Sequence, residues 1–187
     1  MKLIDMTDKK YSETIHKDGN YEYITVSNDE NNVRIYTLKN GLKIFLAQNF
    51  DAPRIQTYIP VRTGSNNDPA DNTGLAHYLE HMMFKGTKKI KAGEFSRLIA
   101  KAGGKENAFT GADYTCYFQQ LEKSNLELSF RLEADRMQNL NLSKEEFDKE
   151  IKVVMEERRW RTDDKPTSQV KEQFASTVFK SHPYSRP

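Results

Sequence analysis

The order of apolar and polar positions along the chain predicts strands in its first part and a mixture of helices and strands after residue 74. Two β-type stretches flank Asn40-Gly41, a dipeptide that favours a tight hairpin turn. Loop-forming residues fill 63–72, before the pattern becomes helical. The predicted strands are 33–38, 42–46, 55–61, 106–109 and 113–121.

Helical spacing of apolar residues predicts the remaining elements. Two helices are expected to begin at capping-box signatures, in which a serine is followed three residues later by a glutamate. These signatures are Ser124 with Glu127, and Ser143 with Glu146. The predicted helices are 75–84, 94–102, one that begins near Ser124, one from 143 to about 161, and one that contains Val170, Phe174 and Val178.

The helix that begins near Ser124 has apolar residues at helical spacing, and we expect this face to be buried. Its members are Leu126, Phe130, Ala134 and Met137. Because strands come first and helices and strands then mix, the fold class is expected to be α+β. We expect a largely antiparallel sheet with helices packed on one side.

The beginning of the chain differs from the rest. Residues 1–32 are polar, with one alternating stretch over 21–26, and they are interpreted as a polar N-terminal extension. Residues 33–187 are expected to form one domain, since their length suits a single core.

Composition narrows the classes of function. The 29 basic and 27 acidic residues nearly cancel, so we expect no binding of nucleic acid or of anionic membrane. No apolar run is long enough for a membrane span, and the first residues contain no apolar stretch typical of a secretory signal. With a single cysteine, Cys116, the chain suits a reducing compartment. We therefore expect a cytoplasmic protein, or a periplasmic or secreted one only if a signal has been removed.

The segment His77-Tyr-Leu-Glu-His81 contains the clearest chemistry. On a helix, His77 and His81 are one turn apart and project from the same face. Two neutral imidazoles at this spacing suit Zn²⁺, and Glu80 lies beside them, where it could reach a metal-bound water. The alternative is a pair of surface histidines with a solvated glutamate, or a pair satisfied in the core.

Two histidines rarely hold a catalytic zinc, so a third ligand is needed. Glu150 and Glu157 are seven residues apart, on one face of a predicted helix, with Val153 and Val154 between them. Carboxylates on a partly apolar stripe are costly to bury unless a positive group meets them. The alternative is an ordinary solvated helix face.

His-x-x-Glu-His is the inverted zinc motif, and the chain resembles the pitrilysin/insulysin family of zinc metallopeptidases, the inverzincins. The resemblance covers roughly residues 33–187 in collinear order. It is greatest to members similar to mitochondrial processing peptidase. The further stretches that resemble the family are 74–77, 81–87, 106–110 and 150–158.

The resemblance implies a zinc-dependent endopeptidase that hydrolyses peptides or unfolded segments. It also implies the fold of the LuxS/processing-peptidase-like metallohydrolases, with an edge strand onto which the substrate backbone is laid. Residue by residue, it implies His77, His81 and Glu157 as zinc ligands, Glu80 as general base, Glu150 as the carboxylate that orients a ligand histidine, and Asn107, Ala108 and Phe109 as the substrate-binding strand.

The chain departs from the family pattern in extent. It resembles the N-terminal part alone, without the arginine and tyrosine that position the substrate carbonyl. The remainder of the chain or a second subunit, in a homo-oligomer, is then expected to close the chamber. The alternative function is a non-catalytic subunit, for processing or peptide binding, whose zinc only stabilises the fold. Glu80 favours the enzyme, because a structural site needs no base.

Overall fold

The computed structural model describes residues 11–186 of the chain. The chain divides into two compact units, and the division falls between Ala52 and Pro53. None of the helices in the described range is both long and apolar enough to cross a membrane.

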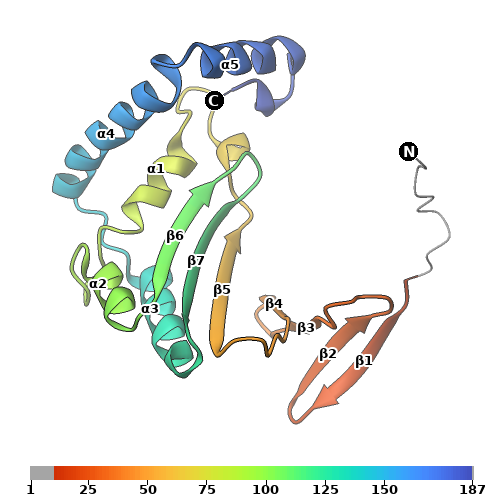
Figure 1. Ribbon diagram of the computed structural model, residues 1–187. Coiled ribbons are helices and arrows are strands. Elements are labelled where there is room, and N and C mark those ends of the chain that lie inside the picture. Colours follow the sequence, from red (N-terminus) through yellow and green to blue (C-terminus); the bar gives the residue numbers. More distant parts are fainter. Residues whose placement is uncertain (1–10, 187) are drawn as a thin grey trace. The chain divides into compact units, whose positions relative to one another are not determined.

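The first unit is a four-stranded antiparallel sheet in the order β1-β2-β3-β4 (Figure 1). The predicted hairpin around Asn40-Gly41 is present as β3 and β4, and Gly41 has a φ of +87°, which glycine adopts without strain. The strands are β1 (Glu13–Asp18), β2 (Tyr21–Val26), β3 (Arg34–Thr37) and β4 (Lys43–Leu46).

This sheet changes the interpretation of residues 1–32. The expected boundary at 32/33 falls between β2 and β3, which pair with each other through Tyr23–Tyr36 and Ile24–Ile35. Residues 11–32 are therefore part of a folded sheet, and the first ten residues lie outside the described range. The strand pattern over 21–26 is real, but its partner over 13–18 is too polar to stand out in the sequence.

The second unit contains a three-stranded antiparallel sheet in the order β5-β7-β6, so that β7 is central and β6 is an edge strand. The β7 strand is buried along almost its whole length, whereas β5 and β6 alternate between exposed and half-buried residues. The strands are β5 (Arg54–Val61), β6 (Lys105–Thr110) and β7 (Thr115–Glu122).

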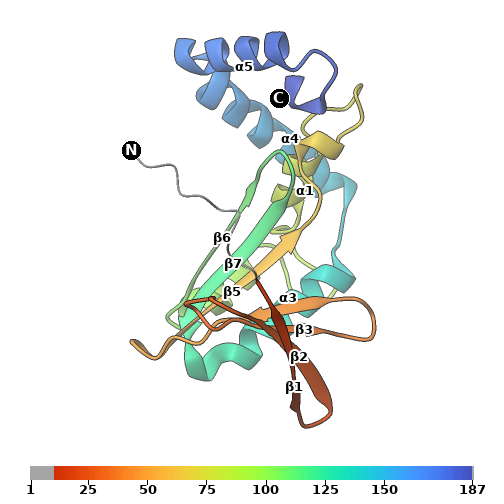
Figure 2. The same cartoon turned by 90° about the vertical axis from the view of Figure 1, so that its right-hand side faces the viewer.

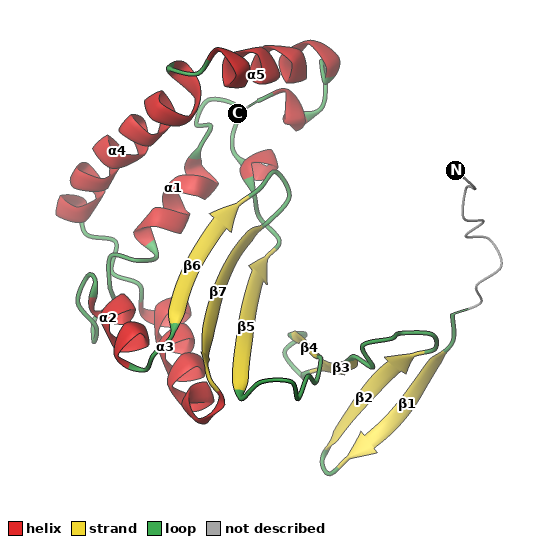
Figure 3. Ribbon diagram, viewed as in Figure 1, coloured by secondary structure: helices red, strands yellow, loops and turns green. Residues whose placement is uncertain are grey.

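Helices cover one face of this sheet, as Figures 1 and 2 show, with α4 lying beyond α1. This arrangement confirms the α+β fold with helices on one side, and Figure 3 shows the two kinds of element separated into layers. The helices are α1 (Leu75–Met82), α2 (Glu94–Lys101), α3 (Leu126–Asn139), α4 (Lys144–Arg158) and α5 (Pro166–Val178). A short π-helical segment, Arg159–Asp163, continues α4.

The hydrophobic core of the second unit lies between the sheet and helices α2 and α3. Its buried members are Phe95, Ile99, Leu121 and Leu132. Half-buried side chains such as Ile55 and Leu98 pack around them. Helix α1 buries apolar residues of its own, Ala76, Tyr78 and Met82, which are not members of this cluster.

Helix α3 corrects the sequence prediction. The expected apolar face is exposed: Phe130 is 57% and Met137 43% accessible. The helix instead buries Leu132 together with Glu133, Arg136 and smaller polar residues. Periodicity alone misplaced the face. Glu133 and Arg136 form an ion pair, and this allows them to occupy buried positions that an amphipathic pattern assigns to solvent.

The sequence predicts a serine cap at the beginning of two helices, and the structure shows one of the two. At α4 the Ser143 side chain accepts a hydrogen bond from the Glu146 N–H, as the capping signature predicts. At α3 the expected Ser124 cap is not formed. The chain makes a short 3-10 turn there, and the Glu122 carboxylate accepts a hydrogen bond from the Ser124 N–H.

Candidate metal centre

Helix α1 begins where a loop carboxylate holds its first turn. The buried Asp68 accepts hydrogen bonds from the backbone N–H groups of Gly74, at 2.8 Å, and Ala76, at 2.9 Å. A carboxylate at a helix N-terminus satisfies unpaired donors and interacts favourably with the helix dipole. Asp68 thereby fixes the start of the helix that bears both histidines.

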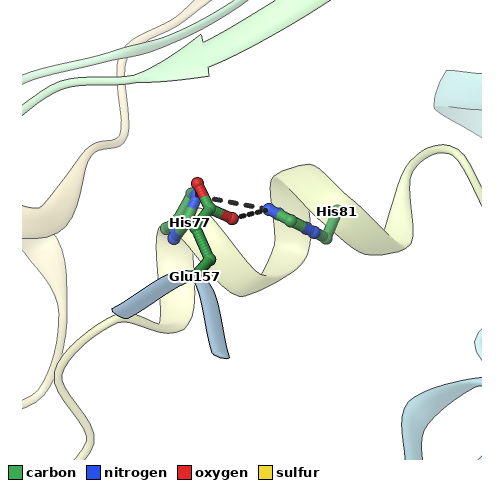
Figure 4. Close-up of side chains that lie close together, drawn as sticks. All are labelled: His77, His81 and Glu157. Atoms are coloured by element: carbon green, nitrogen blue, oxygen red, sulfur yellow. Dashed lines mark hydrogen bonds and ion pairs between the residues drawn. The ribbon is translucent and has the colours of Figure 1, made fainter. Parts of the chain in front are cut away.

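Figure 4 shows His77 and His81 on one face of α1, with Glu157 of α4 beside them. The two Nε2 atoms are 3.3 Å apart, and Glu157 Oε2 lies 3.1 Å from His81 Nε2. The other carboxylate oxygen, Oε1, is 3.8 Å from His77 Nε2. Residues 76 positions apart in the chain, His81 and Glu157, thus meet as the ligand prediction required.

The donor set fits zinc. One atom from each of His77, His81 and Glu157 lies within 4.8 Å of the other two. Tetrahedral zinc with ligands at about 2.0–2.1 Å requires ligand atoms about 3.3 Å apart, and two of the three separations are already close to this value. The three side chains are 17–30% exposed, so an ion could enter from solvent.

Helix α4 is held against α1 by more than the site itself. The Tyr78 hydroxyl donates to the backbone carbonyl of Phe147 at 2.8 Å, and the two rings pack edge to face. Because Tyr78 is next to His77 and Phe147 is three residues before Glu150, this contact sets the register of the two helices. Glu150 and Glu157, two turns apart, then both face α1.

Glu150 occupies the position expected of an orienting carboxylate. Its Oε1 lies 2.9 Å from His81 Nδ1, and its other oxygen pairs with Lys85. Burial alone would raise the pKa of the Glu150 carboxyl, but hydrogen bonds from Lys85 and His81 hold this pKa below its ordinary value. A proton on His81 Nδ1 directed at Glu150 would leave a lone pair on Nε2, the atom that faces His77 and Glu157.

Glu157 also has a cationic neighbour. Arg161 lies one turn further along the chain and approaches Glu157 Oε1 at 2.8 Å. This ion pair engages the oxygen that lies 3.8 Å from His77, while Oε2 is directed at His81.

Glu80 is buried and turned toward the sheet. Its Oε2 accepts a hydrogen bond of 2.5 Å from the Thr110 hydroxyl at the end of β6. The predicted base therefore lies between the helix that bears the two histidines and the strand expected to bind substrate. It is not one of the three residues that could together hold a metal ion.

The predicted substrate-binding residues all lie on β6, the edge of its sheet. Asn107, Ala108 and Phe109 pair with Phe118, Tyr117 and Cys116 of β7, respectively, on the inner side of the strand. The outer side of β6 has no strand partner within the described residues.

Sequence reasoning missed four residues that shape this site: Asp68, Lys85, Thr110 and Arg161. Lys85 and Arg161 had a usable signal, because each follows a predicted site residue, His81 or Glu157, by four positions. Thr110 ends a stretch that resembles the family but had no assigned role. Asp68 lay in a loop with no periodic pattern, and only the fold reveals its contact.

An α+β domain in which an inverted His-x-x-Glu-His helix and a distant glutamate converge defines the class of inverted-motif zinc peptidases. A model of the insulinase family, peptidase family M16, matches residues 43–187. The chain belongs to this family.

Named relatives agree with this assignment. The zinc protease PqqE of Helicobacter pylori is 42% identical over 149 residues, covering 79% of this chain and 34% of that protein. An uncharacterized zinc protease of Rickettsia bellii is 33% identical over 156 residues, covering 83% of this chain and 38% of that protein. The chain thus spans about a third of the length of these curated relatives.

Solved structures show the same fold. A crystal structure of a protease from Helicobacter pylori matches with a TM-score of 0.79 and 40% identity, covering 82% of this chain and 37% of that one. Pitrilysin matches with a TM-score of 0.72 and 27% identity, covering 95% of this chain and 18% of that one. The family resemblance predicted from the sequence is confirmed.

Proposed function

We propose that the chain contains the metal site of a zinc endopeptidase that hydrolyses peptides or unfolded segments with Glu80 as general base. The observation that supports this most strongly is the convergence of His77, His81 and Glu157, with Glu80 on the same helix. His77, His81 and Glu157 would hold Zn²⁺. When bound, the ion would lower the pKa of a water and stabilise negative charge on the substrate carbonyl oxygen.

The other residues then have distinct tasks. Glu150 fixes the tautomer and the ring orientation of His81 through the Nδ1 hydrogen bond. Glu80 accepts the proton of the attacking water and returns it to the leaving amine. Its burial keeps the carboxylate away from bulk water, where competing hydrogen bonds would disorder it.

We propose that peptide binds as an added strand on the outer side of β6. Main-chain hydrogen bonds would then supply affinity with little dependence on sequence, which suits unfolded segments. Asn107 and Phe109 point away from the helices and can contact substrate side chains. Since the chain spans about a third of its relatives, the rest of a chamber would come from a longer chain or from a second subunit in a homo-oligomer.

The test is Glu80→Gln in the intact gene product that contains this chain, assayed on a quenched peptide at equal zinc content. Gln cannot accept the proton, so we expect turnover to fall about 10²–10⁴-fold while zinc content and melting temperature stay the same. Glu156→Gln, an exposed glutamate on α4, is the matched control and should keep full turnover. Normal turnover in Glu80→Gln would exclude Glu80 as the base.

A zinc-loaded wild-type protein without any peptidase activity would instead support the non-catalytic alternative. The same assay on the 187-residue chain tests whether the site is sufficient by itself. We expect this chain to bind zinc but to hydrolyse peptides poorly, because misplacing the scissile carbonyl by about 1 Å can cost about 10²-fold in rate.

A further inference from the structure

Thr110 is the last residue of β6 and faces the helices. Exposed and half-buried residues alternate along this strand, and Glu106, Ala108 and Thr110 share the half-buried side. From this position the Thr110 hydroxyl reaches Glu80 Oε2 at 2.5 Å, across 30 residues of sequence. This is a direct link between the expected substrate-binding strand and the HxxEH helix.

The direction of this hydrogen bond follows from counting protons. The neighbouring Thr115 hydroxyl donates its single proton to the backbone carbonyl of Thr63 at 2.9 Å. Thr115 lies 3.3 Å from Thr110 Oγ1 but has no second proton to give. At the short contact with Glu80 the carboxylate oxygen accepts, so the Thr110 proton is directed at Glu80.

The geometry therefore leaves the two oxygens of Glu80 in different environments. Oε2 is bound to Thr110, and within residues 11–186 the carboxylate accepts no other side-chain hydrogen bond. A carboxylate held at one oxygen loses rotational freedom about its last bond, so the second oxygen keeps a fixed direction. A general base needs this, because proton transfer requires heavy atoms about 2.6–3.2 Å apart.

We propose that Thr110 is a positioning residue for Glu80, and that it couples the orientation of the base to the order of β6. This inference rests on the proposed function. A peptide paired with the outer side of β6 would clamp the strand, and with it the threonine that holds the base. The substrate-binding strand would then help to align the carboxylate that acts on the scissile bond.

Two substitutions at residue 110 test this role in the zinc-loaded intact gene product. Thr110→Val keeps the branched shape and removes the hydroxyl, whereas Thr110→Ser keeps the hydroxyl. We expect Thr110→Val to lower kcat about 10–100-fold with KM within about twofold of wild type, since a misdirected base costs rate and not binding. Thr110→Ser should keep kcat within about threefold of wild type.

Thr115→Val is the matched control, because residues 110 and 115 are direct partners in the sheet. It makes the same chemical change on the adjacent strand without removing the bond to Glu80. We expect its kcat to stay within about threefold of wild type at equal zinc content. A kcat loss in Thr115→Val as large as that in Thr110→Val, or normal kcat in Thr110→Val, would overturn the proposal.

A second measurement tests the bond without activity. In the zinc-free 187-residue chain, the effects of Thr110→Val and Glu80→Ala on melting temperature should be non-additive, since either one removes the same interaction. Additive effects would contradict the bond. If the two substitutions are coupled but the wild-type protein has no peptidase activity, the proposed function is refuted. If the wild-type protein is active and Thr110→Val has normal kcat, only this inference is refuted.

Discussion

The second unit contains two clusters of ionisable side chains that differ in burial. In the buried pair, Arg136 and Glu133, the side chains are 2% and 5% exposed and form bidentate hydrogen bonds. In the open cluster, His77, His81 and Glu157, exposure is 17–30%.

The buried pair is enclosed by protein groups, and only Arg136 Nη1 of its guanidinium nitrogens has no hydrogen-bond partner among the described residues. The Arg136 guanidinium lies over the rings of Phe84, Phe95 and Tyr117 at 4.5–5.2 Å, and Gln119 donates to Glu133 at 2.5 Å. Burial raises the pKa of Tyr117 to about 12, so this ring stays neutral beside the ion pair at physiological pH. All of these partners come from the protein itself.

The open cluster has the opposite character. Two imidazole nitrogens face each other at 3.3 Å with a carboxylate alongside, an arrangement that a cation between them would stabilise. The comparison distinguishes a charge pair that the fold encloses from a cluster that stays open to solvent, as the proposed zinc site requires. A structural charge is closed by the fold, and a binding charge keeps donor atoms directed at a common point that solvent can reach.

The largest loss in the free energy of unfolding is expected from Arg136→Met, which breaks the buried pair. This leaves Glu133 buried without its cation, which typically costs about 3–5 kcal/mol. Urea unfolding of the 187-residue chain should show this loss equally with zinc and with a chelator, because the pair is not part of the metal site.

Arg131→Met on the exposed side of the same helix is the control and should change the free energy of unfolding by less than about 0.5 kcal/mol. Adding Glu133→Gln to Arg136→Met should recover part of the loss, since the uncompensated charge is then gone. Equal losses in the two arginine variants would mean that the buried pair contributes no more than a surface residue.

The second largest effect is expected from His81→Ala in the open cluster, and it concerns the stabilisation of the chain by zinc. Zinc at about 100 times its dissociation constant should stabilise the wild-type chain by about 2.7 kcal/mol, and the variant should lose most of this gain. Melting with and without zinc measures it, with metal content as a second readout.

Without zinc, His81→Ala should lower the melting temperature less than Arg136→Met does, because Glu150 loses its bond to His81 but keeps Lys85 as a cationic partner. His182→Ala, an exposed histidine outside the cluster, is the control and should keep the full zinc-dependent shift. Undiminished zinc content in a His77→Ala/His81→Ala double variant would contradict the ligand assignment.

The two clusters also differ in how well the sequence predicts them. The open cluster follows from local spacing, because His77 and His81 are one turn apart on a helix whose limits the sequence indicates closely. Glu157 was found through the family resemblance and the shared face with Glu150. Strands β3 to β7 were likewise found from alternation and turn residues.

The buried pair could not be found in this way. Glu133 and Arg136 are three residues apart on α3, a spacing typical of a solvated helix face, and the exposed Phe130 and Met137 looked like the core. Only the aromatic rings contributed by distant segments make this polar face the buried one. Thr110 and Asp68 were missed for the same reason, since their contacts join positions that no local pattern relates.

The smallest effect is expected from Glu150→Gln, and it concerns zinc affinity. Glu150 is buried like the Arg136–Glu133 pair, but it is hydrogen-bonded to His81 of the open cluster. The Gln amide oxygen can still accept a hydrogen bond from His81 Nδ1–H but lacks the charge that makes the imidazole a better ligand. Zinc affinity of the 187-residue chain should fall about 10–100-fold, or about 1.4–2.7 kcal/mol. Competition with a chromophoric chelator measures it, and Glu156→Gln on the same helix is the control.

The pH dependence of the zinc-free chain sharpens this last expectation. Because Lys85 and His81 hold the pKa of Glu150 below its ordinary value near 4.5, the folded state binds the proton less readily than the unfolded state does. The contribution of Glu150 to the free energy of unfolding is complete above the pKa that this carboxyl has in the unfolded state. It is lost as the pH falls through the lower pKa that the carboxyl has in the folded state. Wild type should therefore exceed Glu150→Gln in free energy of unfolding at neutral pH, and this advantage should shrink below about pH 4.5. If wild type stays more stable than Glu150→Gln by the same amount down to pH 2, packing and not charge distinguishes the two proteins. In the zinc experiment, a loss of zinc as complete as that of Glu157→Ala would make Glu150 a ligand.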